Sequence, residues 1–194
     1  MSFFNPIING MKKIILFLLA AGLLSGGLLV LISLPIPSSD VELPFVLDNG
    51  VPGVMKVTSP QFLRLGDEAE LTLTIAFNGN QGEALAASEK IKADLQTTLL
   101  EKDPEAEYLA NVSRGGAGKF SWKVTAHSIE PMKATLWCFR ISEAGPELIL
   151  SRDMEFSVKT LLGMRYRFAR WVLGEIMLLC LILAGVTWVR SKRT

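Results

Sequence analysis

The sequence predicts an all-β extracytoplasmic domain, an antiparallel β-sandwich, flanked by two transmembrane α-helices. Two apolar runs bracket the chain, residues 14–34 near the start and residues 171–189 near the end. Between them lies a polar segment, residues 41–160, in which apolar side chains often recur at every second position. A segment of this length is large enough to bury a core of its own. We therefore expect one ordered domain that is attached to a membrane at both ends.

The two apolar runs have the length and composition of membrane-spanning helices. The first holds 21 residues without a charge, and the second holds 19 residues with Glu175 as its one charged side chain. At 1.5 Å per residue, each helix spans about 30 Å, which is the thickness of a bilayer's hydrocarbon core. Lipid offers no partner to unpaired backbone groups, so a helix is the expected form of both runs.

The first run also resembles a bacterial secretory signal. Lys12 and Lys13 precede it as the basic region of such a signal does, which makes Met11 an alternative start. However, the apolar stretch exceeds the usual length of about 7–15 residues, and no Ala-x-Ala cleavage site follows it. No cysteine stands directly after the run to carry a lipid anchor. We expect an uncleaved signal-anchor helix, and a cleaved signal is the alternative.

The basic flanks predict the topology. Lys12 and Lys13 precede the first helix, and no basic residue follows it until Lys56. The positive-inside rule therefore places residues 1–13 in the cytoplasm and the central domain outside. The second helix returns the chain, so that the tail 190–194 is cytoplasmic as well. We expect a two-pass protein of the cell membrane, the inner membrane of a bacterium.

A basic segment above the second helix conflicts with this simple topology. Residues 161–170 combine apolar and aromatic side chains with Arg165, Arg167 and Arg170. Such a segment suits anionic lipid headgroups or an acidic partner surface. Trp171 and Trp188 are expected to mark the two membrane interfaces.

The charge of the central domain limits its partners. Residues 41–160 hold 12 basic and 17 acidic side chains. An acidic domain is a poor match for nucleic acid, because affinity there comes mainly from neutralised phosphates. Cys138 lies in this domain and Cys180 in the second helix, so we expect no disulfide framework.

Alternation of apolar and polar residues predicts strands in the central domain. The runs are 71–77, 120–126, 135–141 and, as two short strands, 148–158. Turn sequences separate them at 78–80, 114–118, 130–131 and 144–146. The proline-containing linker 35–40 ends the first helix and leads away in extended form. Short strands at this spacing are typical of an antiparallel sandwich.

One stretch fits two patterns. Between Ala84 and Leu100, apolar residues alternate as in a strand and also follow a helical stripe. We interpret 90–100 as a strand that a short helical turn precedes at 83–88.

The start of the domain resembles a known family. Thr58-Ser-Pro-Gln-Phe-Leu-Arg-Leu-Gly-Asp67, followed by Glu-Leu-Thr-Leu-Thr-Ile, looks like the first strands of bacterial immunoglobulin-like modules, in which a Leu-Gly-Asp turn introduces a strand. The resemblance covers about 20 residues and implies an immunoglobulin-like sandwich. It implies no activity.

No catalytic, cofactor or metal motif emerges from the sequence. His127 is the one histidine, and a Cys138–His127 pair lacks a nucleophile elbow or glycine loop to complete it. Three carboxylates cluster at 67–70, and four more alternate over 101–107 without the pattern of a calcium loop. The glycines at 115–118 lack the Lys-Ser/Thr of a phosphate loop, so a hairpin loop is expected. Asn111 begins a glycosylation triplet, and we expect it to be unmodified.

The membrane helices carry the most informative candidates. In the first helix, Gly22, Ser25 and Gly26 form a small-residue face of the kind that lets helices approach closely in lipid. Gly174 and Gly185 lie 11 residues apart on one face of the second helix and are candidate partners. The partner can equally be another protein.

Glu175 is the one charged residue within either run. A carboxylate at membrane depth either extends to the interface or makes a polar contact with another membrane chain.

These observations favour a non-enzymatic role. We expect an accessory or scaffold subunit of a membrane complex, with other integral membrane subunits and lipids as partners and with homo-oligomers as an option. The alternative is a tethered sensor or binding module that recognises a peptide, glycan or envelope component through loops of the sandwich. A membrane-bound hydrolase is the third reading.

Overall fold

The computed structural model describes residues 5–47, 50–77, 88–113, 115–143 and 145–193. The chain forms two compact units. The helical unit joins the residues up to Pro35 with those from Met164, and the β unit runs from Ile36 to Gly163.

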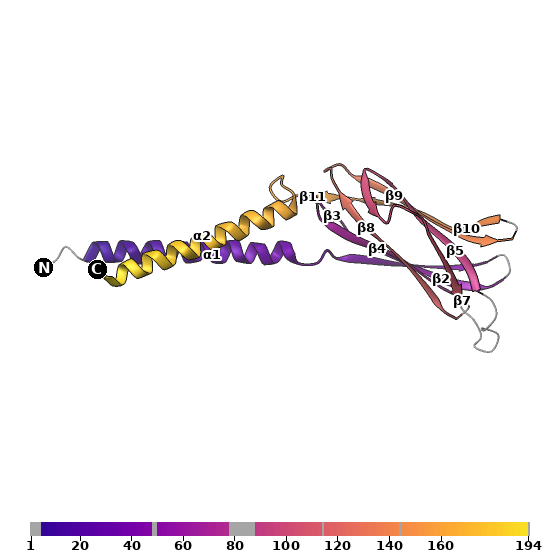
Figure 1. Cartoon of the computed structure of the whole chain (residues 1–194), viewed down its shortest axis with the longest axis horizontal. Helices are drawn as coiled ribbons and strands as arrows, with labels where there is room; N and C mark the ends of the chain where they lie inside the picture. Colours follow the sequence, from indigo (N-terminus) through magenta and orange to yellow (C-terminus); the bar gives the residue numbers. More distant parts are fainter. Residues whose placement is uncertain (1–4, 48–49, 78–87, 114, 144, 194) are drawn as a thin grey trace. The chain divides into compact units, whose positions relative to one another are not determined.

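The helical unit consists of α1 (Asn5–Ser33) and α2 (Tyr166–Arg193). Both are long and apolar enough to cross a membrane, over Lys12–Ser33 and Tyr166–Arg190. They run antiparallel and pack against each other (Figure 1). The beginning of α1 and the end of α2 therefore lie at the same end of the pair. Two such helices are compatible with a two-pass membrane protein.

The local sequence sets the end of α1 and the start of α2. Pro35 follows α1 and has no N–H to continue the helical ladder. Two residues with positive φ, Leu162 at 53° and Gly163 at 75°, precede α2 and turn the chain toward it. The helices extend beyond the apolar runs, since α1 already begins at Asn5 and α2 at Tyr166.

The β unit is mostly antiparallel sheet (Figure 1). The first sheet has the strand order β1–β2–β4–β8–β6, with the bounds β1 Ser38–Val46, β2 Pro52–Pro60, β4 Glu68–Phe77, β8 Ala117–Ala126 and β6 Leu100–Asp103. The second sheet has the order β10–β9–β5–β7, with β10 Gly145–Phe156, β9 Met132–Ser142, β5 Ser88–Thr98 and β7 Tyr108–Ser113. A short parallel pair joins β3 (Leu63–Arg64) to β11 (Val158–Lys159).

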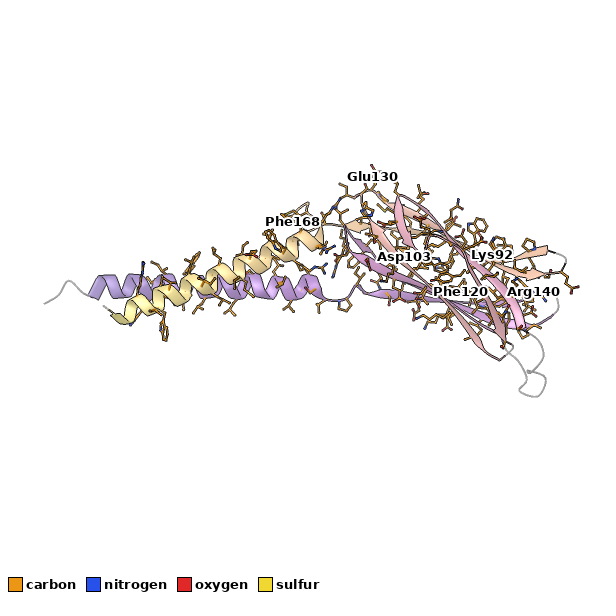
Figure 2. The ribbon with its side chains drawn as sticks, in the orientation of Figure 1. Lys92, Asp103, Phe120, Glu130, Arg140 and Phe168 are labelled. Carbon is orange, nitrogen blue, oxygen red and sulfur yellow. The ribbon has the colours of Figure 1, made fainter. Side chains whose placement is uncertain are left out.

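One core serves both sheets. Leu71, Leu73 and Ile75 of β4 are fully buried, and so is Leu95 of β5. They belong to one cluster, which also contains Phe120 (labelled in Figure 2) and side chains of β9. Burial alternates along β4, β5, β8 and β9, so one face of each of these strands is turned to the core.

Polar and aromatic contacts tie the two sheets and their strands together. Tyr108 of β7 donates a hydrogen bond to the carbonyl of Ser121 in β8 at 2.8 Å, and its ring meets that of Trp122 edge to face. Arg140 of β9 (labelled in Figure 2) donates to Glu89 of β5 at 2.8 Å and to Glu147 of β10 at 3.2 Å. The Glu89 carboxylate, followed by Glu147, raises the pKa of the Arg140 guanidinium.

The segment 61–65 connects the two ends of the β unit. The Gln61 N–H donates to the carbonyl of Pro37, just before β1, at 2.9 Å. The N–H groups of Leu63 and Leu65 donate to the carbonyls of Ser157 and Lys159, at 2.9 and 3.0 Å. This segment, which we call the clasp, therefore bonds both to the strand that enters the unit and to the strand that leaves it.

The structure corrects several strand boundaries. The predicted linker 35–40 is shorter, because β1 begins at Ser38 and pairs with β2. The predicted strand 90–100 is confirmed as β5, but it ends at Thr98. Leu99 adopts a positive φ of 64°, and the chain crosses there into β6 of the other sheet. Of the helical turn expected at 83–88, residues 83–87 lie outside the described residues, and Ser88 is in β5.

The glycine-rich residues 115–118 do not close a hairpin. They lead from β7 of the second sheet into β8 of the first, and these strands do not pair with each other. Gly115 adopts a φ of 77°, which favours glycine. At Gly118, an added Cβ would lie 2.5 Å from Cγ2 of Val112, so the close approach of the two strands requires a glycine.

The shared core predicts a large cost for truncating a buried leucine. Replacing Leu95 with Ala should lower the free energy of unfolding by about 2–5 kcal/mol, because the side chain is fully buried. Leu109→Ala is the matched control, since that side chain is 56% exposed, and it should change stability by less than about 0.5 kcal/mol. Urea unfolding of the full chain, followed by tryptophan fluorescence, measures both. Equal losses for the two variants would contradict the burial assigned to β5.

Candidate functional site

The small residues of α1 form a contact face for α2. Gly22 and Ser25 are buried within the helical unit, and Gly26 is half-buried. A Cβ added at Gly22 would lie 3.5 Å from Cβ of Cys180, and one at Gly26 would lie 3.1 Å from the sulfur of Met177. The absence of side chains at these two positions therefore lets α2 approach the backbone of α1.

Ser25 does not bridge the two helices. Its hydroxyl donates within α1, to the carbonyls of Ala21 and Gly22, both at 3.0 Å. The polar group is thereby satisfied inside its own helix, as is usual for serine in a lipid environment. Ser25 contributes its small volume to the contact face.

The residues of α2 that meet α1 are not the predicted glycines. Cys180 lies against Gly22, and Met177 lies against Gly26. Ala169 and Ala184, at helical spacing from Cys180, are buried as well. An added Cβ at Gly174 or Gly185 would meet no atom within 4 Å, so the structure does not bring these two glycines against α1. The signal that reasoning from the sequence missed is the helical spacing of Ala169 and Ala184 relative to Cys180.

Glu175 lies on the side of α2 that is turned away from α1. Its side chain is exposed in the helical unit, and so are its helical neighbours Trp171, Leu178 and Leu179. Within the described part of the chain, Glu175 has no hydrogen-bond or ion-pair partner. It lies four residues, or about 6 Å along the helix, beyond Trp171. The carboxylate of Glu175 is therefore exposed within an apolar surface of the helical unit.

Three of the arginines, Arg165, Arg167 and Arg170, lie at the start of α2. Arg165 precedes the helix, and its carbonyl accepts the N–H of Ala169 at 3.0 Å. Arg165 and Arg167 are exposed, whereas Arg170 is half-buried. Beside them, Phe168 (labelled in Figure 2) and Trp171 stack with ring centroids 6.1 Å apart. Trp188 is exposed near the other end of α2.

In the β unit, the structure does not combine His127 with Cys138. The thiol of Cys138 is fully buried in the core, and burial raises its pKa to about 12. His127 follows β8 on the surface, where its Nε2 lies 2.6 Å from Glu101. A thiol with this pKa supplies almost no thiolate at neutral pH, so the pair lacks a nucleophile.

Carboxylates of the two predicted acidic clusters bond to different side chains. Glu68 lies 3.5 Å from Lys123, and Glu107 pairs with Lys92 at 2.5 Å. Glu70 accepts the Ser121 hydroxyl at 2.5 Å, and this hydrogen bond lowers the pKa of the carboxyl group. Within the described ranges, no group of three metal-binding side chains forms.

A hollow on the second sheet was not predicted from the sequence. It has a volume of about 540 Å³ and lies over β5 and β9, beside β6. Its lining consists of Lys92, Asp94, Gln96, Thr97, Lys102, Glu107, Trp137 and Phe139. These residues come from four separate segments of the chain, so no local sequence pattern predicts the hollow. Asn111 is also exposed on this sheet, on the edge strand β7.

Two aromatic rings and two ion pairs define the hollow. Trp137 and Phe139 stand on the same face of β9, with centroids 6.2 Å apart and ring planes within 10° of parallel. The indole N–H of Trp137 donates to the side-chain oxygen of Gln96 at 3.3 Å. Lys102 reaches across from β6 and donates to Asp94 at 2.9 Å and to the Leu95 carbonyl at 2.6 Å.

Comparisons with known proteins assign no family to the chain. No protein-family model and no curated protein matches the sequence. A solved complex of zinc α2-glycoprotein and prolactin-inducible protein from human seminal plasma is similar at 13% identity and a TM-score of 0.42, over 66% of this chain and 98% of that chain. A conjugative transposon lipoprotein from Bacteroides eggerthii is similar at 14% identity and a TM-score of 0.33, over 63% and 97% of the two chains. The cupredoxin domain of amoB from Nitrosocaldus yellowstonii is similar at 15% identity and a TM-score of 0.26, over 56% of each chain. Likeness at this level assigns no function.

The contact at Gly22 predicts a specific cross-link. A cysteine placed there should form a disulfide with the native Cys180, because the two Cβ atoms would lie 3.5 Å apart, within the range that a disulfide allows. Oxidation of Gly22→Cys in membranes, followed by mass spectrometry of the linked peptides, measures it. Gly27→Cys is the matched control, since its Cβ would meet no atom within 4 Å. An equal yield from the two variants would contradict the packing of α1 on α2.

Proposed function

We propose that this protein is a non-enzymatic accessory or scaffold subunit of a membrane protein complex. It crosses the inner membrane of a bacterium twice, with α1 as an uncleaved signal-anchor and with both termini in the cytoplasm. The β unit is an immunoglobulin-like sandwich on the outer side. Its partners are other integral membrane subunits, which it meets through the membrane helices and the β unit.

The observation that carries this proposal is the position of Glu175. An isolated carboxylate within the apolar part of a membrane helix is costly, by about 2.5–3.5 kcal/mol at the centre of the bilayer and by less near an interface, where Trp171 is expected to lie four residues before Glu175. The contact with α1 does not offset this cost, because it uses the opposite side of α2, with Met177 and Cys180. A second membrane helix that presents a hydrogen-bond donor or a basic side chain to Glu175 would offset it.

The surroundings of Glu175 support the same role. Trp171, Leu178, Leu179 and Ile182 lie within about two helical turns of Glu175 and are all at least half exposed in the helical unit. They form an apolar surface around the carboxylate, which we call the docking face of α2. Van der Waals packing on such a surface and one polar contact at its centre are the usual components of helix association in lipid.

The chemistry of the β unit supports a role without catalysis. The buried Cys138 has a pKa of about 12, and His127 is paired with Glu101 on the surface. Glu68 and Glu70 of β4 are held by Lys123 and Ser121. These groups are used in structural contacts, which favours a surface for binding over a reaction centre.

A second candidate function is that of a tethered binding module. The hollow over β5 and β9 favours it, because half-buried aromatic rings beside polar groups are typical of ligand sites. The two functions do not exclude each other, since the docking face and the hollow belong to separate units.

The docking face predicts that Glu175→Leu weakens association with a membrane partner. Interhelical hydrogen bonds in lipid contribute about 0.6–1.7 kcal/mol, so the affinity for the partner, and with it the recovery, should fall about 3- to 18-fold. Glu175→Gln should fall less, since an amide still accepts a hydrogen bond. Purification in a mild detergent, with quantified stoichiometric partners, measures the change.

The control for this experiment is Gly27→Ala, which adds a methyl group where no atom lies within 4 Å. It should leave recovery unchanged. A wild-type protein that purifies as a lone monomer would overturn the subunit role and favour the binding module. Full recovery with Glu175→Leu would remove the carboxylate from the interface.

A further inference from the structure

The outer face of the second sheet carries side chains that the membrane role does not use. Trp137 and Phe139 of β9 point away from the core, whereas Leu136 and Cys138 between them are fully buried. An aromatic residue directed away from an available core costs hydrophobic stabilisation that burial would provide. Two of them at successive outward positions indicate a surface that is kept for contact with another molecule.

The charges in the hollow are neutralised internally. Lys92 pairs with Glu107 at 2.5 Å, and Lys102 pairs with Asp94 at 2.9 Å. The lining therefore holds two cations and two anions and presents no net charge. An anionic or cationic ligand would have to break one of these pairs, so a neutral ligand is favoured.

The polar groups of the lining are placed to bind hydroxyl groups. The amide of Gln96 accepts the indole N–H with its oxygen, which directs its two N–H donors elsewhere. The carboxylate of Asp94 has acceptor capacity beyond its one bond from Lys102. Donors and acceptors thus stand close to the two rings, and a hydroxyl group can serve either kind.

The floor of the hollow excludes recognition by strand addition. It lies on β5 and β9, and both are inner strands, with β7, β5, β9 and β10 paired in succession. Their backbone groups are used in the ladders, so an extended peptide cannot pair with them there. Recognition in the hollow depends on side chains alone.

We propose that this hollow is a binding site for a neutral saccharide. A pyranose ring has apolar C–H faces and a rim of hydroxyl groups. Its C–H faces suit the electron-rich faces of Trp137 and Phe139, which share one orientation to within 10°. The hydroxyl rim suits Gln96, Asp94 and Thr97 beside them. This inference rests on the second of the two proposed functions and is independent of the docking face of α2.

The site predicts saturable binding of a neutral oligosaccharide. The full chain, held in lipid nanodiscs so that no sugar-based detergent competes, is titrated with chitotetraose, cellotetraose and maltotetraose. We expect at least one of them to bind and to change the tryptophan fluorescence. Trp137→Ala should weaken that binding at least tenfold, because the loss of one stacked aromatic side chain removes most of the apolar contact.

Matched variants separate binding from folding. Leu109→Ala truncates an exposed side chain on the neighbouring strand β7, outside the lining of the hollow, and should leave the affinity unchanged. Trp137→Tyr retains an aromatic ring and should bind better than Trp137→Ala. Unfolding in urea shows whether each variant is folded, and the Tyr variant decides the matter if the Ala variant is not.

Three outcomes would overturn the proposal. The first is that none of the three oligosaccharides shows saturable binding up to about 10 mM. The second is unchanged affinity in both Trp137 variants. The third is Trp137-dependent binding of a proline-rich decapeptide in place of the saccharides, which would assign the hollow to a peptide. Failure of the Glu175 variants to alter partner recovery would bear only on the scaffold role.

Discussion

The clasp at residues 61–65 is the interaction on which the arrangement of the β unit depends. Its backbone N–H groups bond to Pro37, where the chain enters the unit, and to Ser157 and Lys159, where it leaves. The clasp thus holds together the first and the last segments of the β unit. Leu63 of β3, within the clasp, is fully buried, so this part of the clasp belongs to the core.

In the helical unit, small residues allow the two helices to pack against each other. Lipid supplies no hydrophobic force between two apolar helices, so close packing must hold them together. Gly22 and Gly26 provide this packing by admitting Cys180 and Met177 to the backbone of α1. Because α2 uses this face for its contact with α1, its opposite face is exposed in the helical unit. The same division appears in the β unit, where one face of the second sheet fills the core and the other carries the hollow.

The sequence predicts those features that repeat along the chain, and it misses those that depend on distant segments. Composition identified both helices, and alternation identified β4, β8 and β9. Strand β1 was not predicted, and one reason is that it carries Pro44 and charged residues. An edge strand tolerates these residues, whereas a central strand does not. The helical face of Gly22 was visible in the sequence, but its partner was not, since a periodic pattern does not say which residues lie opposite. The hollow needs Lys102 of β6 beside Trp137 of β9, and only the crossing at Leu99 brings them together.

Site-directed labelling tests most directly the claim that the β unit lies outside the cytoplasm between two membrane crossings. Single cysteines replace the exposed Ile129 in the β unit and Lys12 in α1, in a Cys180→Ser background that retains the buried Cys138. A membrane-impermeant maleimide is added to sphaeroplasts before and after permeabilisation. The account predicts labelling at position 129 in intact sphaeroplasts and at position 12 only after permeabilisation. Labelling of position 12 in intact sphaeroplasts, or protection of position 129, would contradict it.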